Sequence, residues 1–208
     1  MPYFQSIIFM ILSYFFGAIP ISFILCKKLK NVDIRKVGSK NVGATNAGRI
    51  LGKTWFFIIM VFDILKGFLP VHLAKYFMGQ GLLVPSSLLL LAIAFSTILG
   101  HLYPVYLNFK GGKGVTVSAG MLMAFDYRLV IGALVIFIII VFITRYISAG
   151  SVVAAVILPV LYALFYKNDI DIVFFIFIIL LALYVIYKHK ENIKRIIQGK
   201  ERKWGERV

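Results

Sequence analysis

The stretch VTVSAGMLMAF, from Val115 to Phe125, decides how many times this chain can cross a membrane. It is largely apolar, which predicts a helix, but about 11 helical residues rise only some 16–17 Å. The hydrocarbon core of a bilayer is roughly 30 Å thick and takes about 20 residues of helix. Length alone therefore does not say whether this segment crosses.

The rest of the chain has the composition of a membrane protein. Of its 208 residues, 61% are hydrophobic and 15% are charged, and the mean hydropathy of +0.94 lies far above that of a soluble domain. The further apolar runs are Phe4–Leu25, Thr54–Met78, Pro85–Leu102, Leu129–Ile143, Ile147–Tyr166 and Ile170–Tyr187. We expect an all-α integral membrane protein, with one transmembrane domain over residues 1–208.

The distribution of Lys and Arg favours a crossing by the short segment. If it crosses, one face of the membrane collects Lys27–Lys53, Lys110, Lys113, Arg145 and the tail Lys188–Arg207, and the other keeps little beyond Arg128 and Lys167. If it does not, the tail with its eight Lys and Arg lies outside, against the positive-inside rule. The sequence thus predicts seven transmembrane helices, one of them short, with the N-terminus outside and the C-terminus cytoplasmic.

Composition also narrows the partners. The formal net charge of +15 lies next to the predicted spans, which indicates contact with membrane lipids that have anionic headgroups, and no nucleic-acid-binding motif accompanies it. The single Cys26 excludes an internal disulfide. The few carboxylates form no close pair on the inner face, so we expect no metal and no other cofactor. We expect the protein to be a monomer.

The residues directly before the short helix, FKGGKG, indicate an anion site. Consecutive glycines let the backbone approach a ligand, and the first N–H groups of a helix beginning near Val115 would point at it. Lys110 and Lys113 add positive charge, so the glycine loop, Lys110–Gly114, suits a phosphate. It fails the P-loop pattern, because Gly114 follows Lys113 where a Ser or Thr is needed. The alternative is a plain glycine turn with two lysines that reach the headgroups.

A second polar segment is the first loop, Gly38–Gly52, which reads GSKNVGATNAGRILG. It surrounds Arg49 with hydroxyl and amide groups, and the planar guanidinium of an arginine suits bidentate binding of a phosphate. An ordinary interhelical loop with helix caps is the alternative. Ser39 and Asn46 are the candidate ligands beside Arg49.

Two further segments lie on the same predicted face. HKENIKRIIQGKER places His189, Asn192 and Arg195 one helical turn apart, so the three side chains can line one stripe. The alternative for this segment is an amphipathic basic helix that rests on the headgroups. RYISAGS adds Ser148 and Ser151. We expect these four separated segments to converge at the cytoplasmic ends of the helices.

The motifs closely resemble those of the bacterial acyl-phosphate:glycerol-3-phosphate acyltransferases, and the likeness runs essentially end to end. Three segments correspond, in this order, to the cytoplasmic motifs of that family: GSKNVGATNAGR, GHLYPVYLNFKGGKGV and HKENIKRIIQGKE. Two shorter segments, DILKG and TRYIS, also look like family features. The resemblance implies transfer of a fatty acyl group from acyl phosphate to the 1-hydroxyl of glycerol 3-phosphate, which yields lysophosphatidic acid and phosphate. It also implies a multi-pass protein of the bacterial plasma (inner) membrane with a cytoplasmic active site.

Two substrates that each carry a phosphate require two cationic cradles. To acyl phosphate we assign Gly111, Gly112, Lys113, Gly114 and Thr116, and mainly to glycerol 3-phosphate we assign Ser39, Asn46, Arg49, His189 and Asn192. Lys110 is also expected to bind substrate. Because an acyl phosphate is already activated, positioning and charge stabilisation can carry the reaction without a covalent acyl-enzyme.

The groups expected to act in the chemistry itself are His101, His189, Lys113 and Ser151, while Ser148 is expected to bind substrate. The proton acceptor is His101, His189 or an oxygen of a substrate phosphate, and the sequence does not choose among them. It also leaves open which of Ser148 and Ser151 matters more. His101 alternatively caps carbonyls at a helix end.

Two other functions fit the sequence less well. A transporter for a small organic phosphate would also use a glycine loop at a helix N-terminus, but it needs access from both sides and the polar motifs cluster on one. A CDP-alcohol phosphotransferase would need clustered carboxylates for its metal. Asp63 and Lys66, three residues apart within a span, are expected to form a structural ion pair.

Overall fold

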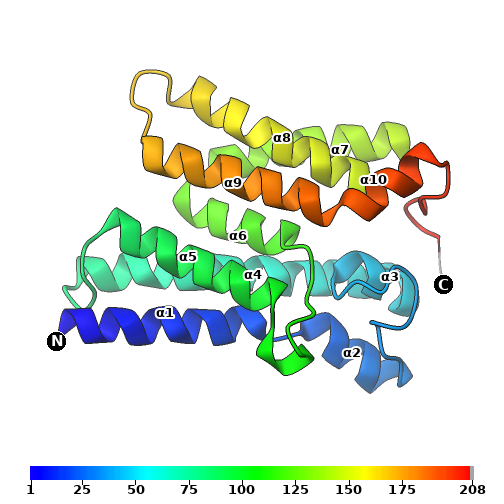
Figure 1. The fold of residues 1–208 in the computed structure, drawn as a ribbon, viewed down its shortest axis with the longest axis horizontal. Coiled ribbons are helices and arrows are strands. Elements are labelled where there is room, and N and C mark those ends of the chain that lie inside the picture. The colour runs from blue at the N-terminus through cyan, green and yellow to red at the C-terminus, as the bar shows by residue number, and fades with distance from the viewer. Residues whose placement is uncertain (207–208) are drawn as a thin grey trace. The chain divides into compact units, whose positions relative to one another are not determined.

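The computed structural model describes residues 1–206, and every regular element in them is a helix (Figure 1). Arg207, which the sequence places in the basic tail, lies outside the described residues. Residues 1–125 and 126–206 form two compact units. The first holds α1 (Pro2–Ala18), α2 (Ile21–Lys30), α3 (Ala44–Leu51), α4 (Lys53–Gly79), α5 (Ser87–Leu102), the 3₁₀ turn η1 (Val105–Leu107) and α6 (Val115–Phe125). The second holds α7 (Tyr127–Thr144), α8 (Ile147–Phe165), α9 (Ile172–Lys188) and α10 (Lys190–Ile197).

The apolar runs in the sequence are all helical. Five helical segments of the described residues are long and apolar enough to cross a membrane, and α9 with α10, bent by 54°, makes a sixth if the pair is one span. The predicted short segment is α6, with the bounds Val115–Phe125 that the sequence gives. The all-helical fold and the helices of membrane-spanning length are therefore confirmed, while the number of crossings and their direction stay predictions.

The first predicted span, Phe4–Leu25, is broken toward its C-terminal end. Residues 19 and 20 separate α1 from α2, and Ile19 takes an extended backbone with φ −58° and ψ 113°. Pro20 explains the break, because proline has no N–H to donate and disfavours helical geometry at the residue before it.

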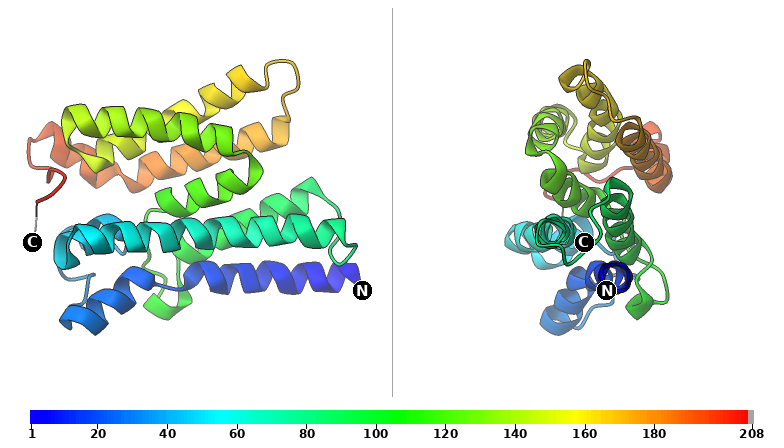
Figure 2. Two further views of the ribbon diagram at one scale, coloured as in Figure 1. Left: turned by 180° about the vertical axis from the view of Figure 1, so that it is seen from behind. Right: turned by 90° about the vertical axis from the view of Figure 1, so that its left-hand side faces the viewer.

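Within residues 1–125, α4 runs alongside α1 and α5 and packs closely against α6 (Figure 2). Glycines permit the approach of α4 to α6. A Cβ atom on Gly67 would overlap the Val117 carbonyl, and one on Gly120 would overlap the Ile64 carbonyl. The two backbones therefore touch, which fixes the short helix against the long one.

Two lysines of α4 satisfy carbonyls at helix ends. Lys66 Nζ donates to the Ile19 carbonyl at the break after α1 (3.0 Å), and Lys75 Nζ donates to the Ala124 carbonyl near the end of α6 (2.6 Å). The last carbonyls of a helix have no partner within it, and an unpaired one is costly where water is excluded. These lysines let α1 and α6 end in a largely apolar bundle.

In residues 126–206, α8 packs against both α7 and α9. Asp126 caps α7 by accepting from the Arg128 N–H (2.9 Å), and the Tyr162 ring packs on Tyr166 and Phe174 with centroids 4.8 and 5.4 Å away. At the other end, the chain after α10 turns back, so that the Trp204 N–H donates to the Arg145 carbonyl (2.7 Å). This turn brings residues after α10 to the start of α8.

Candidate functional site

The glycine loop is folded back onto the end of α5. The Gly111 N–H donates to the Leu102 carbonyl and the Gly112 N–H donates to the His101 carbonyl, each at 3.2 Å. Gly114 has a φ of +84°, in the left-handed region, and α6 begins at the next residue. The N–H groups of the first turn of a helix have no partner within it. Backbone donors at 115–117 and the loop lysines therefore lie within a few residues of one another, as an anion site requires.

Two of the loop glycines are needed for packing as well as for any ligand. A Cβ atom on Gly111 would overlap the His101 carbonyl. A Cβ atom on Gly112 would overlap His101 Nε2 and lie 2.6 Å from the Val42 carbonyl. The sequence suggested that Gly112 leaves room for a phosphate, and the structure adds that it lets the loop lie against the His101 ring.

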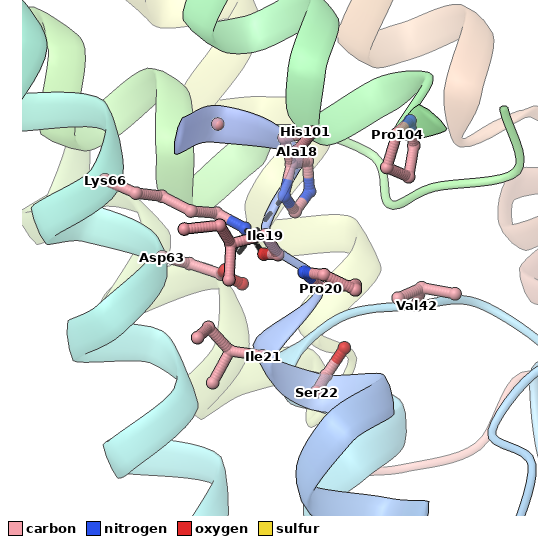
Figure 3. A pocket seen from close by; sticks show the side chains of 11 residues that line it. Ala18, Ile19, Pro20, Ile21, Ser22, Val42, Asp63, Lys66, His101 and Pro104 are labelled. Carbon is pink, nitrogen blue, oxygen red and sulfur yellow. Dashed lines mark hydrogen bonds and ion pairs between the residues drawn. The ribbon is translucent and has the colours of Figure 1, made fainter. Parts of the chain in front are cut away.

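The predicted ion pair between Asp63 and Lys66 is present behind the loop, with 3.0 Å between Nζ and Oδ1. His101 Nδ1 is 4.0 Å from the same carboxylate oxygen, and Thr116 Oγ1 is 3.5 Å from the other. Figure 3 shows Asp63, Lys66 and His101 around a small pocket beside the α1–α2 break; residues 17–22, Val42 and Pro104 complete its lining. His101, a candidate base, is thus enclosed, with 7% of its surface exposed.

Loop residues differ in exposure. Lys110 is exposed, whereas Lys113 and Thr116 are half-buried and Gly112 and Gly114 are buried. The Ser118 hydroxyl, in the first turns of α6, is buried without a hydrogen-bond partner in the described part of the chain. The sequence had not singled out Ser118, because serine is common in apolar helices.

In the first loop, Asn46 holds the backbone together. Its Nδ2 donates to the carbonyls of Ile34, Val37 and Asn41 (3.2, 2.9 and 3.2 Å), and its Oδ1 accepts from the Ser39 N–H (3.0 Å). Asn46 is 1% exposed, so its amide builds the loop that carries Ser39, whose side chain is exposed. Arg49 lies in the last turn of α3 and is half-buried.

The segment before the first loop has its own ion pair. Arg35 donates to both carboxylate oxygens of Asp33, at 3.0 and 2.9 Å. These hydrogen bonds from Arg35 lower the pKa of Asp33 to about 2. A carboxylate with so low a pKa is a weak base, so Asp33 is a poor candidate for a proton acceptor.

In the second unit, a buried carboxylate joins two of the predicted segments, RYISAGS and HKENIKRIIQGKER. Glu201 Oε1 accepts from Ser148 Oγ (2.8 Å) and Asn192 Nδ2 (2.6 Å), and Oε2 accepts from Arg195 Nε (2.7 Å). Burial alone would raise the pKa of Glu201, but the hydrogen bonds from Arg195, Asn192 and Ser148 outweigh it and lower the pKa. We call Ser148, Asn192, Arg195 and Glu201 the Glu201 cluster.

Sequence reasoning missed Glu201 as a site residue. It stands in the third quoted motif, after a glycine turn. That turn, with Gly199 at φ +65°, is the signal that could have placed an acid back against Asn192 and Arg195.

The remaining candidates of the second unit are His189 and Ser151. His189 is 3% exposed and lies at the bend between α9 and α10, where Nδ1 is 2.8 Å from the Val185 carbonyl. A carbonyl can only accept, so Nδ1 carries the proton and Nε2 is the basic nitrogen of the neutral ring. Ser151 donates to the Ile147 carbonyl one turn earlier (2.9 Å), whereas Ser148 belongs to the Glu201 cluster.

The structure therefore groups the predicted site residues in two sets. His101, Thr116 and the glycine loop lie together in residues 1–125, and Ser148, His189 and Asn192 belong to residues 126–206. Convergence of all four segments stays a prediction. Among residues 1–206, no three His, Cys, Asp or Glu side chains are grouped so as to hold a metal ion.

The long apolar helices and the polar groups at their ends define a multi-pass helical membrane protein. The family model for glycerol-3-phosphate acyltransferase matches residues 7–199. This chain belongs to the glycerol-3-phosphate acyltransferase family, which confirms the resemblance seen in its motifs and makes the protein an acyltransferase.

Related proteins and structures cover nearly the whole chain. The glycerol-3-phosphate acyltransferase of Thermotoga petrophila is 42% identical over 94% of this chain and 95% of its own length, and that of Desulforamulus reducens is 36% identical over 100% and 99%. The crystal structure of PlsY (YgiH), an integral membrane glycerol 3-phosphate acyltransferase, is similar in its glycerol 3-phosphate form, with a TM-score of 0.84, 34% identity and 96% of each chain covered. Its lysophosphatidic acid form gives a TM-score of 0.81 and 32% identity, over 97% of this chain and 96% of that one.

Proposed function

We propose that this protein transfers a fatty acyl group from acyl phosphate to the 1-hydroxyl of glycerol 3-phosphate, and releases lysophosphatidic acid and phosphate. Family membership supports the acceptor and the product, since structures of a relative exist in glycerol 3-phosphate and lysophosphatidic acid forms. The observation that supports acyl phosphate as the acyl donor is the glycine loop, in which backbone N–H groups and two lysines lie at the N-terminus of a short helix. Such a cradle fits a phosphate leaving group better than a neutral thioester.

In the proposed reaction, the hydroxyl oxygen attacks the acyl carbonyl carbon. The bond from that carbon to the phosphate oxygen breaks, the phosphate leaves with the electron pair, and the hydroxyl proton passes to a base. Lys113 and the N–H groups at the start of α6 would stabilise the charge that builds up on the departing phosphate. Holding the two reactants together supplies much of the remaining acceleration.

The geometry favours His189 over His101 as the protein base, with a substrate phosphate oxygen as the remaining candidate. The hydrogen bond between Nδ1 and the Val185 carbonyl leaves His189 Nε2 basic and holds the ring in one orientation. The ring of His101, by contrast, has the Asp63 carboxylate near Nδ1 and Gly112 against Nε2. His101 is better suited to supporting the loop than to accepting a substrate proton.

We assign the phosphate of glycerol 3-phosphate mainly to Arg49, with Ser39, His189 and Asn192 as further ligands. The guanidinium of Arg49 can bind a phosphate through two parallel hydrogen bonds. Asn46 serves this site indirectly, because its four hydrogen bonds hold the loop around Ser39. Of the two serines, Ser148 donates to Glu201, the same carboxylate that binds Asn192, so we assign Ser148 a role in orienting Asn192. Ser151 remains a candidate for a part in the reaction itself.

We further propose seven crossings, with the N-terminus outside, the C-terminus in the cytoplasm and α6 as the short crossing. Basic residues then gather on the cytoplasmic side, in contact with anionic lipids of the bacterial inner membrane, and the active site faces the cytoplasm. A single copy carries both proposed cradles, so the protein would act as a monomer.

The test is a product assay with purified protein in detergent or lipid. Acyl phosphate and labelled glycerol 3-phosphate should give labelled lysophosphatidic acid, and omission of either substrate should abolish it. Product from acyl-CoA but not from acyl phosphate would refute the donor. Uptake of labelled glycerol 3-phosphate into proteoliposomes without any product would favour a transporter instead.

A further inference from the structure

Asp63 lies in the middle of α4 and makes more contacts than an ion pair needs. Its side chain is 4% exposed, and the carboxylate faces Lys66 at 3.0 Å, His101 Nδ1 at 4.0 Å and the Thr116 hydroxyl at 3.5 Å. These partners come from α4, α5 and α6. Lys66 alone would neutralise the charge, so the contacts to α5 and α6 call for a separate explanation.

His101 connects the carboxylate to the glycine loop. Its carbonyl accepts from the Gly112 N–H (3.2 Å), and its ring lies where a side chain on Gly112 would be. A negative charge near Nδ1 favours the tautomer that carries its proton there, and it holds the ring in one orientation. The position of the ring in turn limits where the backbone of Gly112 can lie.

Thr116 makes the second connection, on the far side of the loop. It is the second residue of α6, and its hydroxyl donates toward Asp63 Oδ2 at 3.5 Å, a long hydrogen bond. One carboxylate therefore faces a residue on each side of the loop, His101 before it at 4.0 Å and Thr116 after it at 3.5 Å. The N–H groups that begin α6 are carried by the same turn as Thr116.

Lys66 has a different task. Figure 3 shows its side chain reaching toward the α1–α2 break, where Nζ donates to the Ile19 carbonyl (3.0 Å). A buried ion pair is often no more stabilising than apolar residues of the same size, so the pair is not explained by stability alone. The two residues of the ion pair therefore have different roles: Lys66 donates to a carbonyl at a helix break, and Asp63 faces the glycine loop.

We propose that Asp63 is a positioning residue for the glycine loop, acting through His101 and Thr116 to hold the loop and the start of α6 in the geometry that binds the donor phosphate. The proposal rests on the proposed function, because it takes the loop to be the donor site. It assigns Asp63 no contact with substrate. Its consequence is that loss of the carboxylate should loosen the loop even where the rest of the protein is intact.

The test removes the charge pair without leaving an unpaired charge. Asp63→Leu alone would strand the ammonium of Lys66, so we combine it with Lys66→Gln, whose amide can still donate to the Ile19 carbonyl. The conservative pair Asp63→Asn with Lys66→Gln keeps an acceptor for His101 and Thr116. Asp126→Asn is the matched control, since Asp126 is also a buried carboxylate bound to an arginine and a hydroxyl, through Arg128 and Tyr166.

The first measurement is steady-state kinetics with both substrates varied. In the double variant Asp63→Leu with Lys66→Gln (the Leu–Gln protein), kcat/KM for acyl phosphate should fall between about 10- and 100-fold, the range that a small displacement of a binding group produces. KM for glycerol 3-phosphate should stay within about twofold. The double variant Asp63→Asn with Lys66→Gln (the Asn–Gln protein) should recover part of the lost kcat/KM, and Asp126→Asn should match the wild type. If the Leu–Gln protein keeps wild-type kcat/KM for acyl phosphate, the proposal is wrong.

The second measurement needs no substrate. Hydrogen–deuterium exchange over residues 107–118 should be faster in the Leu–Gln protein than in the wild type, with exchange over 127–144 unchanged. Equal exchange over 107–118 would overturn the proposal even if the wild type proved inactive with acyl phosphate, so the two failures are distinct. If the Leu–Gln protein does not fold, the Asn–Gln protein is judged by the same two criteria.

Discussion

At the scale of single residues, the carboxylate of Glu201 ties the start of α8, the α10 helix and the turn after it by three hydrogen bonds. All three donors contact an ion that is 8% exposed, so each hydrogen bond is worth more than one between neutral groups at the surface. Glu201 thereby orients Asn192, which the proposed function places beside glycerol 3-phosphate.

Replacing Glu201 with Gln should lower the free energy of unfolding by about 1–3 kcal/mol, because the charge that Arg195 needs is lost. The effect should depend on pH. The folded-state pKa of Glu201 is lowered, so its contribution is present above the ordinary glutamate pKa of about 4.3 and is lost as the pH falls through the lower folded value.

The measurement is the melting temperature of both proteins in detergent between neutral and acidic pH. The difference between wild type and Glu201→Gln should be largest near neutrality and shrink at acid pH. A difference that stays constant across that range would contradict the ionised state assigned to Glu201.

Arg49 gives the prediction for the acceptor site. Arg49→Ala should reduce kcat/KM for glycerol 3-phosphate about 10- to 150-fold, the equivalent of roughly 1.5–3 kcal/mol for a charged hydrogen bond. Arg49→Lys should fail to restore it, because lysine keeps the charge but not the paired geometry. Rate measurements at varied concentrations of each substrate check this, and a lysine variant equal to wild type would show that charge alone suffices.

Much of the chemistry at this scale can be predicted from the sequence, but not which atoms are already engaged. Residue types identified Asn46 and Ser148 as polar candidates, yet only the fold shows that Asn46 bonds to four backbone groups and that Ser148 donates to Glu201. Those partners lie 5 to 12 and 53 residues away, and no local pattern reports contacts at such separations.

At the scale of elements, the helices follow from apolar length, and the breaks follow from proline and glycine. The bounds of α6 were predictable because the glycines before it and Asp126 after it end the apolar run. The apolar pattern did not predict the break between α1 and α2, because the run of apolar residues continues on both sides of Pro20. Lys66, whose ammonium pairs with the Ile19 carbonyl there, could be linked to the break only by the fold.

The contact between α4 and α6 gives a prediction about stability. Gly120→Ala should lower the melting temperature, because the new methyl group overlaps the Ile64 carbonyl and overpacking costs about 1–3 kcal/mol. Gly79→Ala, in the last turn of α4, is the control, since a side chain there meets nothing within 4 Å. Equal melting temperatures for the two variants would contradict the close packing of the helices.

The glycine loop gives a prediction about activity. In Gly112→Ala, the methyl group must displace the His101 ring or the Val42 carbonyl, so the loop shifts. We expect kcat/KM for acyl phosphate to fall about 100-fold or more, while the protein still folds and elutes as the wild type does. Near-normal turnover in a folded Gly112→Ala protein would remove the loop from the donor site.

At the scale of the whole molecule, the proposed membrane arrangement rests on the distribution of Lys and Arg and not on packing. Tags at the two ends should lie on opposite sides of the membrane, because an odd number of crossings is the one that keeps the basic segments in the cytoplasm. Protease protection of each tag in inverted and right-side-out vesicles measures this. Both tags on one side would refute seven crossings.

The proposed mechanism requires that the donor's own phosphate leave from the glycine loop. The direct measurement is the ratio of inorganic phosphate to lysophosphatidic acid formed by the purified protein from acyl phosphate labelled in its phosphorus and glycerol 3-phosphate. We predict one labelled phosphate released for each lysophosphatidic acid, with both rates reduced equally by Gly112→Ala. Lysophosphatidic acid without matching phosphate release, or release that Gly112→Ala leaves unchanged, would contradict it.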